Sequence, residues 1–341
     1  MKKIAELAGV SRATVSRVLS KPEKVHPKTR ERIQSLMEQS GYTYHAGAAE
    51  LIKRKTFFIG LVIPSVISLA FSNTVLAVQE AADELGMSVI LGCSEFDEKK
   101  ESKLLSQFMT RRVAGVIMCG NTVENEDQIL RLQQIGIPCV IIWTTPDNPN
   151  LCQAGFDNRA ASATAVKYLI DMGHKHIALI TGPLGGGRRV SDRILGFTST
   201  MEKHGLAVPE GYLRRAEPTI VNGEREAFGL LEMSPRPTAI FAASDMLAIG
   251  VLSAARKMSL NVPRDLSVIG FDDIEFATHT EPPLTSVAVP EKEMSRMAIH
   301  MIKQLINKEI SPPRTFCLDT QLIVRKSCAP PGDNGLGALP V

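Results

Sequence analysis

Apolar residues in the first forty positions recur every three or four residues, which is the period of an α-helix. Two short helices are predicted, over residues 4–8 and 13–19. The side chains expected in their shared core are Ile4, Leu7, Ala8, Val15, Val18 and Leu19. Gly9 suits the tight turn between these helices, and Ser11 is a good N-cap for the second one. A third helix is predicted over residues 28–40, and so small a core is expected to be marginal by itself.

From residue 57 the pattern changes to continuous apolar runs that alternate with amphipathic segments. The runs predict seven strands, at residues 57–63, 87–92, 115–120, 138–143, 176–181, 239–244 and 266–271. The segments between and after them predict eight helices, near residues 75–85, 98–112, 125–135, 158–172, 191–204, 222–232, 245–258 and 291–307. Continuous apolar strands bounded by helices indicate parallel sheets covered on both faces. Seven such units exceed one comfortable sheet, so we predict two doubly wound α/β subdomains.

Composition is that of an ordinary globular protein, with 44% hydrophobic and 22% charged residues over 341 positions. A chain of this length is expected to form two or three domains. No stretch approaches the roughly 20 apolar residues that span a bilayer, and no apolar signal segment is predicted. The six cysteines lie far apart without a C-x-x-C pair, which indicates reduced thiols. We therefore expect a cytoplasmic protein that makes no use of a membrane.

Charge is unevenly distributed along the chain. Residues 1–55 carry 12 Lys or Arg and 5 Asp or Glu, a net charge of +7, whereas the remainder has a net charge of −4. A small basic module joined to a mildly acidic body is typical of a nucleic-acid contact at one end. A basic helix that is merely solvated gives the same charge count, so charge alone leaves both interpretations open.

Several enzyme signatures are absent from the sequence. The glycines at 185–187 lack the spacing of a phosphate-binding loop or of a dinucleotide-binding fingerprint, and they predict a flexible turn. No nucleophile–base pair is evident, and His174 and His176 stand at a strand entrance, where structural histidines are common. We expect neither an enzyme nor a bound cofactor or metal. A sugar-transport component is disfavoured because it has no use for a basic N-terminal module.

Polar and charged residues follow several predicted strands, at the sheet edge where open α/β folds bind ligands. Three arginines crowd one such loop, at Arg188, Arg189 and Arg193, and Asp272 follows another strand. A carboxylate and a guanidinium that face one cleft suit vicinal hydroxyl groups, since one accepts and the other donates hydrogen bonds. The extra arginines would clamp a carboxylate. Arg188 and Arg189 could instead be a solvated pair, and Trp143 could either stack on a ligand ring or pack.

Six segments in the same order resemble the LacI/GalR family of bacterial transcription regulators over nearly the whole chain. They are LAGVSRATVSRVL, TRERIQSLMEQSGY, DMGHKHIALITGP, PTAIFAASDMLAIG, VPRDLSVIGFDDIE and PPLTSVAVP. The resemblance implies a three-helix helix-turn-helix headpiece, a hinge helix, and a core like periplasmic sugar-binding proteins. The implied boundaries are 1–44 for the headpiece, 45–56 for the hinge and 57–327 for the core. The core would divide into 57–155 with 283–314 and 156–282 with 315–327, followed by a disordered tail at 328–341.

The resemblance also implies which residues contact DNA. The second headpiece helix would enter the major groove, where early side chains reach base edges. The expected DNA-binding residues are Arg12, Ala13, Thr14, Ser16, Arg17, Thr29, Ala48 and Leu51. Arg17 would donate to a guanine, Thr14, Ser16 and Thr29 would hold phosphates, and Leu51 would wedge into the minor groove beside Ala48. Because one headpiece offers few contacts, a homodimer on palindromic double-stranded operator DNA is expected.

The same resemblance assigns effector-binding positions. They are Ser68, Phe71, Asp157, Arg189, Arg193, Ser244 and Asp272. The segments CQAGFDN and IPSVISLAF resemble the gluconate-responsive members of the family, and the arginine-rich loop favours a sugar acid. The sequence therefore predicts a repressor whose operator affinity is set by a small sugar or sugar-acid effector, gluconate-like by preference. Whether the effector induces or co-represses stays open.

Overall fold

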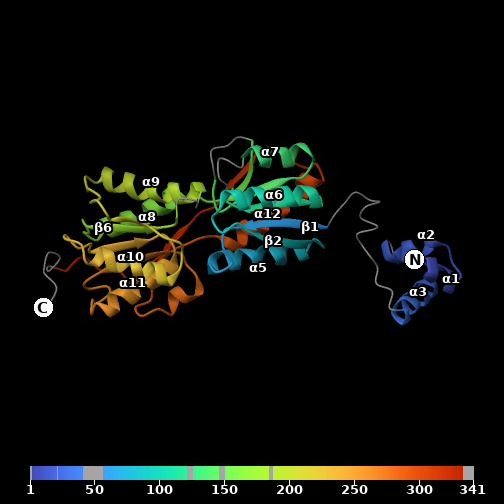
Figure 1. Ribbon diagram of the computed structural model, residues 1–341, viewed down its shortest axis with the longest axis horizontal. Coiled ribbons are helices and arrows are strands. Elements are labelled where there is room, and N and C mark those ends of the chain that lie inside the picture. The colour runs from blue at the N-terminus through green and yellow to red at the C-terminus, as the bar shows by residue number, and fades with distance from the viewer. Residues whose placement is uncertain are drawn as a thin grey trace. The chain divides into compact units, whose positions relative to one another are not determined.

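Helical and strand-forming segments separate into two compact units in the computed structural model, Met1–Thr56 and Phe57–Val341 (Figure 1). The structure describes residues 2–20, 22–40, 57–120, 126–145, 150–183 and 187–332. The predicted hinge at 45–56 lies outside these ranges, and each unit is described by itself.

The smaller unit holds α1 (Lys2–Leu7), α2 (Arg12–Ser20), the short 3₁₀ helix η1 (Pro22–Lys24) and α3 (Pro27–Gln39). Its core consists of Ile4, Ala5, Ala8, Val15, Val18, Ile33 and Met37. Leu7 was predicted in this core but is 56% exposed. The buried stripe runs through Ile4 and Ala5 of α1 and on to Ala8 in the turn that follows, and Leu7 lies outside this stripe.

Local chemistry explains where α2 begins. The Ser11 hydroxyl accepts a hydrogen bond from the Thr14 backbone N–H at 3.1 Å, and it also pairs with the Thr14 hydroxyl at 2.9 Å. Gly9 takes a left-handed backbone, with φ of +57°, in the turn before it. The predicted cap and turn are therefore confirmed. By contrast, His26 precedes α3 without a side-chain capping bond, and Pro27 at the first position supplies the helix-compatible φ instead.

In the larger unit, the first sheet has six parallel strands in the order β11-β5-β4-β3-β1-β2. Their bounds are β1 (Phe58–Ile63), β2 (Ser88–Cys93), β3 (Gly115–Cys119), β4 (Cys139–Ile142), β5 (Cys152–Gly155) and β11 (Arg314–Cys317). Helices α5 (Leu69–Asp83) and α12 (Glu291–Ile306) pack together against it, and α6 (Glu98–Arg111) and α7 (Glu126–Gln134) form a second pair. Both faces of this apolar sheet are thus covered.

The second sheet has the order β12-β10-β9-β8-β6-β7, with β12 antiparallel to β10 and the other pairs parallel. Its strands are β6 (Ile177–Thr181), β7 (Leu213–Arg215), β8 (Ala239–Ala242), β9 (Ser267–Asp272), β10 (Thr285–Ala288) and β12 (Gln321–Ile323). Its helices are α8 (Asn158–Asp171), α9 (Gly187–Lys203), α10 (Ile220–Leu231), α11 (Asp245–Lys257) and the 3₁₀ helix η4 (Glu275–Thr278). Helices α8 and α9 pack as one pair, and α10 and α11 as another.

The strand pairings move two of the predicted subdomain boundaries. The boundary predicted at 283 is early, because β10 at 285–288 pairs with β9 in the second sheet. The boundary predicted at 315 is also early, because β11 at 314–317 pairs with β5 in the first sheet. Both strands are only four residues long, and no continuous apolar run marks them.

The tail predicted to be disordered from 328 is ordered through 332. The His174 Nε2–H donates to the Ala329 carbonyl at 2.9 Å, and the Ala329 N–H donates to the Ser267 hydroxyl at 3.0 Å. His174 is 2% exposed, and burial lowers its pKa. This histidine therefore serves to attach the C-terminal segment to the second sheet. Residues 333–341 lie outside the described ranges.

Candidate effector cleft and DNA-reading helix

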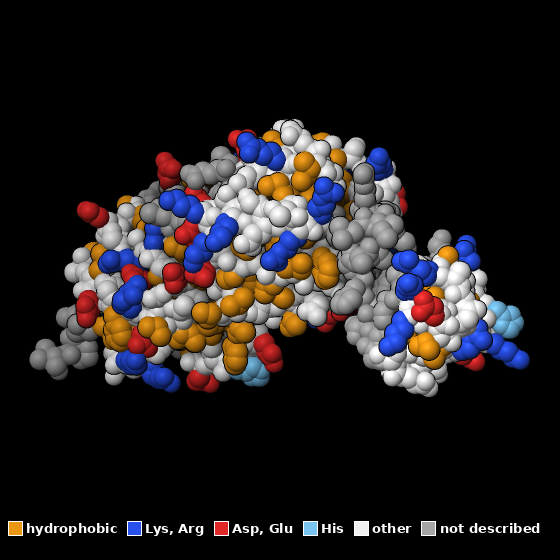
Figure 2. All heavy atoms as spheres, turned by 45° about the vertical axis from the view of Figure 1, so that its right-hand side comes forward, with side chains coloured by type: hydrophobic (Ala, Val, Ile, Leu, Met, Phe, Trp, Pro, Cys, Tyr) orange, Lys and Arg blue, Asp and Glu red, His pale blue; other side chains and the backbone are white. Residues whose placement is uncertain are grey.

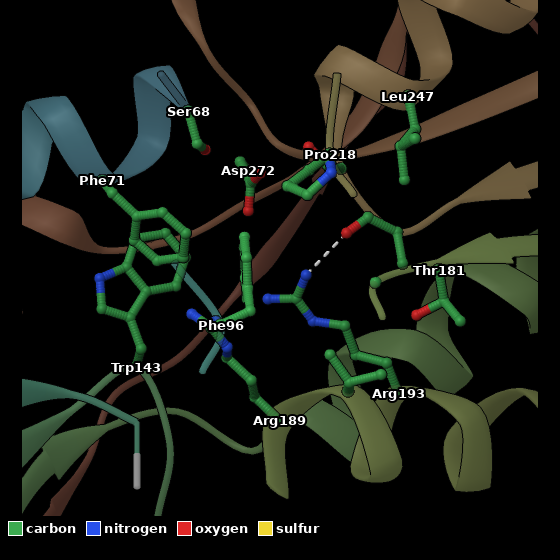
Figure 3. A pocket seen from close by; sticks show the side chains of 14 residues that line it. Ser68, Phe71, Phe96, Trp143, Thr181, Arg189, Arg193, Pro218, Leu247 and Asp272 are labelled. Atoms are coloured by element: carbon green, nitrogen blue, oxygen red, sulfur yellow. Dashed lines mark hydrogen bonds between the residues drawn. The ribbon is translucent and has the colours of Figure 1, made fainter. Parts of the chain in front are cut away.

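A hollow in the larger unit is lined from the carboxyl ends of strands in both sheets (Figure 3). Its lining residues are Ser68, Phe71, Phe96, Trp143, Thr181, Gly182, Arg189, Val190, Arg193, Pro218, Ala243, Ser244, Leu247 and Asp272. Six of the seven predicted effector residues meet there, since only Asp157 is missing from the lining. The structure thus brings together side chains that are up to about two hundred positions apart in the sequence.

The wall contributed by the first sheet is aromatic. Phe71 comes from the first turn of α5, and its ring centre lies 5.1 Å from that of Trp143 at the end of β4. Phe96 reaches the same wall from the loop after β2, where Glu95 and Phe96 both have left-handed backbones with φ of 52° and 58°. Sequence reasoning missed Phe96 because its direction depends on this unusual loop geometry rather than on periodicity. Such strained residues concentrate at functional sites.

Arg193, on α9, is the most firmly held cation of the cleft. Its Nε–H donates to the Asn158 side-chain oxygen at 2.8 Å, and Nη1 donates to the Ala243 carbonyl at 2.7 Å. Its guanidinium carbon lies 3.7 Å from the centre of the Phe271 ring, a cation–π contact. Burial lowers the Arg193 pKa to about 10, and Asp272 opposes that shift. The side chain therefore stays charged at neutral pH in a fixed orientation.

Arg189 lies one turn earlier on α9 and is 6% exposed, so the alternative of a solvated arginine is wrong for it. Its guanidinium carbon lies 4.7 Å from the Phe71 ring centre and 5.9 Å from that of Phe96. Arg188 is half-buried and does not line the cleft. Two of the three crowded arginines therefore face the hollow.

Asp272 provides the opposite charge at the end of β9. It is 7% exposed and has a φ of +104°, a backbone conformation that costs about 1–3 kcal/mol and is typical of functional positions. Burial raises its pKa to about 6, and Arg193 and Arg189 oppose that rise. The two guanidinium groups thus favour the ionised form of this carboxyl group. The Thr181 hydroxyl is buried beside the cleft without a hydrogen-bond partner among the described residues.

Asp157, which was predicted to bind effector, does not line the hollow. Its exposed carboxylate caps α8 by accepting a hydrogen bond from the Ala160 N–H at 2.9 Å. The next residue, Asn158, is the one that turns inward to Arg193. The side chain of an N-cap residue turns back to the N–H groups of the first helical turn. Because α8 begins at Asn158, Asp157 is the cap, and Asn158 is the residue whose side chain faces the cleft.

In the headpiece, α2 presents an exposed face that includes Arg12, Ala13 and Arg17. Thr14, Ser16 and Thr29 are half-buried. Figure 2 shows Lys and Arg side chains spread over the smaller unit. Ala48 and Leu51 lie outside the described residues. Among the residues that are described, no group of three or more His, Cys, Asp or Glu side chains could hold a metal ion, and no helix is long and apolar enough to cross a bilayer.

Comparison with known proteins finds a match for each end of the chain. Residues 1–44 match the family described as bacterial regulatory proteins, lacI family, and residues 166–328 match a periplasmic binding protein-like domain. The HTH-type transcriptional regulator DegA of Bacillus subtilis (strain 168) is 33% identical over 332 residues, covering 96% of this chain and 97% of that protein.

Two solved structures are similar to this chain over nearly its whole length. The Lac repressor dimer bound to operator and the anti-inducer ONPF is 25% identical, with a TM-score of 0.83 over 96% of this chain and 98% of that one. The complex of the transcriptional regulator CelR with cellobiose is 28% identical, with a TM-score of 0.71 over 95% and 98% of the two chains. This chain therefore belongs to the lacI family of bacterial regulatory proteins, and it is a DNA-binding transcription regulator rather than an enzyme.

Proposed function

We propose that this regulator is a repressor whose operator affinity is controlled by a sugar acid, with gluconate as the preferred effector. The observation that carries the proposal is the placement of Asp272 opposite Arg189 and Arg193 in one buried hollow. A sugar acid matches this arrangement, because its carboxylate accepts from guanidinium groups while its hydroxyls donate to Asp272. The relative CelR is solved with cellobiose, which supports a carbohydrate in this cleft.

The remaining walls fit the rest of such a ligand. Thr181 offers a hydroxyl that both donates and accepts. The rings of Phe71, Phe96 and Trp143 form an apolar surface for the carbon skeleton. Ligand sites of this kind combine apolar walls with a few placed polar groups. Ser68 and Ser244 complete the polar side of the proposed site, which does not include Asp157.

At the other end, the proposal places α2 in the major groove of palindromic operator DNA, with Arg17 donating to a guanine. The Lac repressor structure is a dimer on its operator, which supports a homodimer here. The larger unit also exposes large apolar side chains, including Leu76, Val221 and Phe276, at 60%, 76% and 58%. Figure 2 shows hydrophobic side chains gathered across one face, as expected for a protein–protein interface.

In the proposed mechanism, the effector cleft and the DNA-binding headpiece are coupled through the angle between the two core subdomains. An effector that touches both walls of the cleft changes this angle, which moves the hinge helices and either holds Leu51 in the minor groove or withdraws it. Because the two sites are thermodynamically linked, an effector that weakens operator binding must itself bind more weakly to the DNA-bound form.

Replacing Arg17 by alanine tests the DNA-reading end. We expect specific operator binding to weaken by about 1–3 kcal/mol and binding to scrambled DNA to change little, because a bidentate guanine contact is lost. Fluorescence anisotropy on a palindromic operator with a central CpG and on its scrambled version measures both values. Arg32→Ala removes the same charge from an exposed position of α3 and should not reduce specificity. Equal losses on both DNAs for Arg17→Ala would contradict base readout.

A further inference from the structure

Asn158 joins the two walls of the cleft through a single side chain. It is the first residue of α8, directly after the chain has crossed from β5 in the first sheet to the second subdomain, and it is 1% exposed. Its amide nitrogen donates to the Trp143 carbonyl at 2.8 Å, and its amide oxygen accepts from Arg193 Nε at 2.8 Å. One bond therefore reaches the aromatic wall and the other reaches the cleft arginine.

On the side of the first sheet, Trp143 is held by one hydrogen bond from its side chain and one from its backbone. Its indole N–H donates to the Thr74 hydroxyl on α5 at 3.0 Å, and its backbone N–H donates to the Met294 sulfur on α12 at 3.0 Å. Its backbone is left-handed, with φ of +70°, and the residue is 1% exposed. A displacement of the Trp143 carbonyl would therefore be passed to α5 and α12, the two helices that cover one face of the first sheet.

On the side of the second subdomain, Arg193 is held by the close pairing of α8 and α9. The Ser162 hydroxyl donates to the Arg193 carbonyl at 2.7 Å, and a Cβ at Gly196 would lie 2.3 Å from the Arg159 carbonyl oxygen. These two helices thus move together, and a shift of the Arg193 guanidinium acts on the Asn158 oxygen. The same amide carries that shift to the Trp143 carbonyl.

We infer that Asn158 is a positioning residue that couples occupancy of the cleft to the first subdomain. The planar primary amide of Asn158 offers a donor to the Trp143 carbonyl and an acceptor to Arg193 Nε at the same time. Aspartate keeps the acceptor and loses the donor, whereas leucine of similar size loses both. The identity of the effector rests on the function proposed above, but the relay between Arg193 and Trp143 does not.

Trp143 is the single tryptophan of the chain, so its fluorescence tests this relay without any ligand. Arg193→Lys is compared in the wild-type and Asn158→Leu backgrounds by emission maximum and acrylamide quenching. We expect the substitution to change both quantities in the wild-type background and to leave them unchanged in the Asn158→Leu background. An equal change in the two backgrounds would overturn the inference. Asn158→Asp replaces Asn158→Leu in this comparison if the leucine variant does not fold.

Coupling to DNA is then measured with D-gluconate as the probe, as the ratio of operator dissociation constants with and without it. Couplings of this kind are roughly 5–150-fold, and we expect Asn158→Asp to reduce the ratio to below about twofold while gluconate still binds. Asn222→Asp is the matched control, because the Asn222 amide donates to the Glu217 carbonyl at 3.2 Å and does not line the cleft. Full coupling in Asn158→Asp would contradict the inference. Failure of gluconate to bind the wild-type protein would reject the proposed effector, and the fluorescence comparison would still decide on the relay.

Discussion

Replacing Arg193 by alanine is expected to weaken effector binding by about 2–5 kcal/mol, because a ligand carboxylate would lose its buried, hydrogen-bonded guanidinium partner. The substitution also removes the bonds to Asn158 and Ala243 and the contact with Phe271, so the free protein becomes less stable as well. The informative quantity is therefore the rise in melting temperature that the ligand causes in each variant.

Thermal-shift measurements with gluconate and glucose separate the clamp from general sugar binding, since glucose lacks the carboxylate. Wild-type protein should be stabilised more by gluconate than by glucose, and Arg193→Ala should lose the gluconate effect. Arg188→Ala, a half-buried neighbour outside the cleft, should retain it. If gluconate still stabilises Arg193→Ala, Arg193 does not bind the ligand carboxylate.

Glu291→Gln is expected to stabilise the protein by about 2 kcal/mol or more at pH 8.5 and by little at pH 5. Glu291 begins α12, and its Oε1 is buried without a hydrogen-bond partner among the described residues. Burial and the nearby carboxylates Asp272 and Asp273 raise its pKa to about 8, while Asn73 and Lys292 oppose the rise. The ordinary value is 4.5.

The direction of the pH effect follows from this shift. Between pH 4.5 and 8 the folded protein holds a proton on Glu291 that the unfolded chain has already released, so stability falls as pH rises through this interval. Glutamine cannot ionise, so the Glu291→Gln variant does not lose stability from this group as the pH rises. Urea denaturation at pH 5 and pH 8.5 measures the difference, with the exposed neighbour Glu293→Gln as the control. An equal effect of Glu291→Gln at both pH values would show that ionisation of this group is not the cause.

Much of the core could be predicted because buried parallel strands leave long apolar runs in the sequence. The central strands β1, β3, β6, β8 and β9 have such runs, and the structure confirms them. Short strands such as β7 and β12 have three residues each, and their existence depends on the neighbouring strand rather than on their own pattern. The subdomain boundaries predicted at 283 and 315 were early for the same reason, because the strands beside them, β10 and β11, have only four residues each.

The charged residues of the cleft could be predicted from the sequence, but the complete set of lining residues could not. Arg193 and Asp272 follow strands whose carboxyl ends must meet, so topology alone brings them to one edge. Choosing between Asp157 and Asn158 requires the first turn of α8, which the sequence locates only to within a residue or two. Phe96 enters through two left-handed residues, a loop conformation with no sequence signal here, since neither residue is glycine or asparagine.

If the cleft controls the basic headpiece, a ligand of the cleft must change the affinity of the full chain for operator DNA. Operator affinity of the full chain is measured by fluorescence anisotropy with and without a ligand that raises the melting temperature of the wild-type protein but not of Arg193→Ala. We expect the operator dissociation constant to change by roughly 5–150-fold and the dissociation constant for scrambled DNA to stay the same. An operator affinity that is unaffected by saturating ligand would show that the cleft does not control DNA binding.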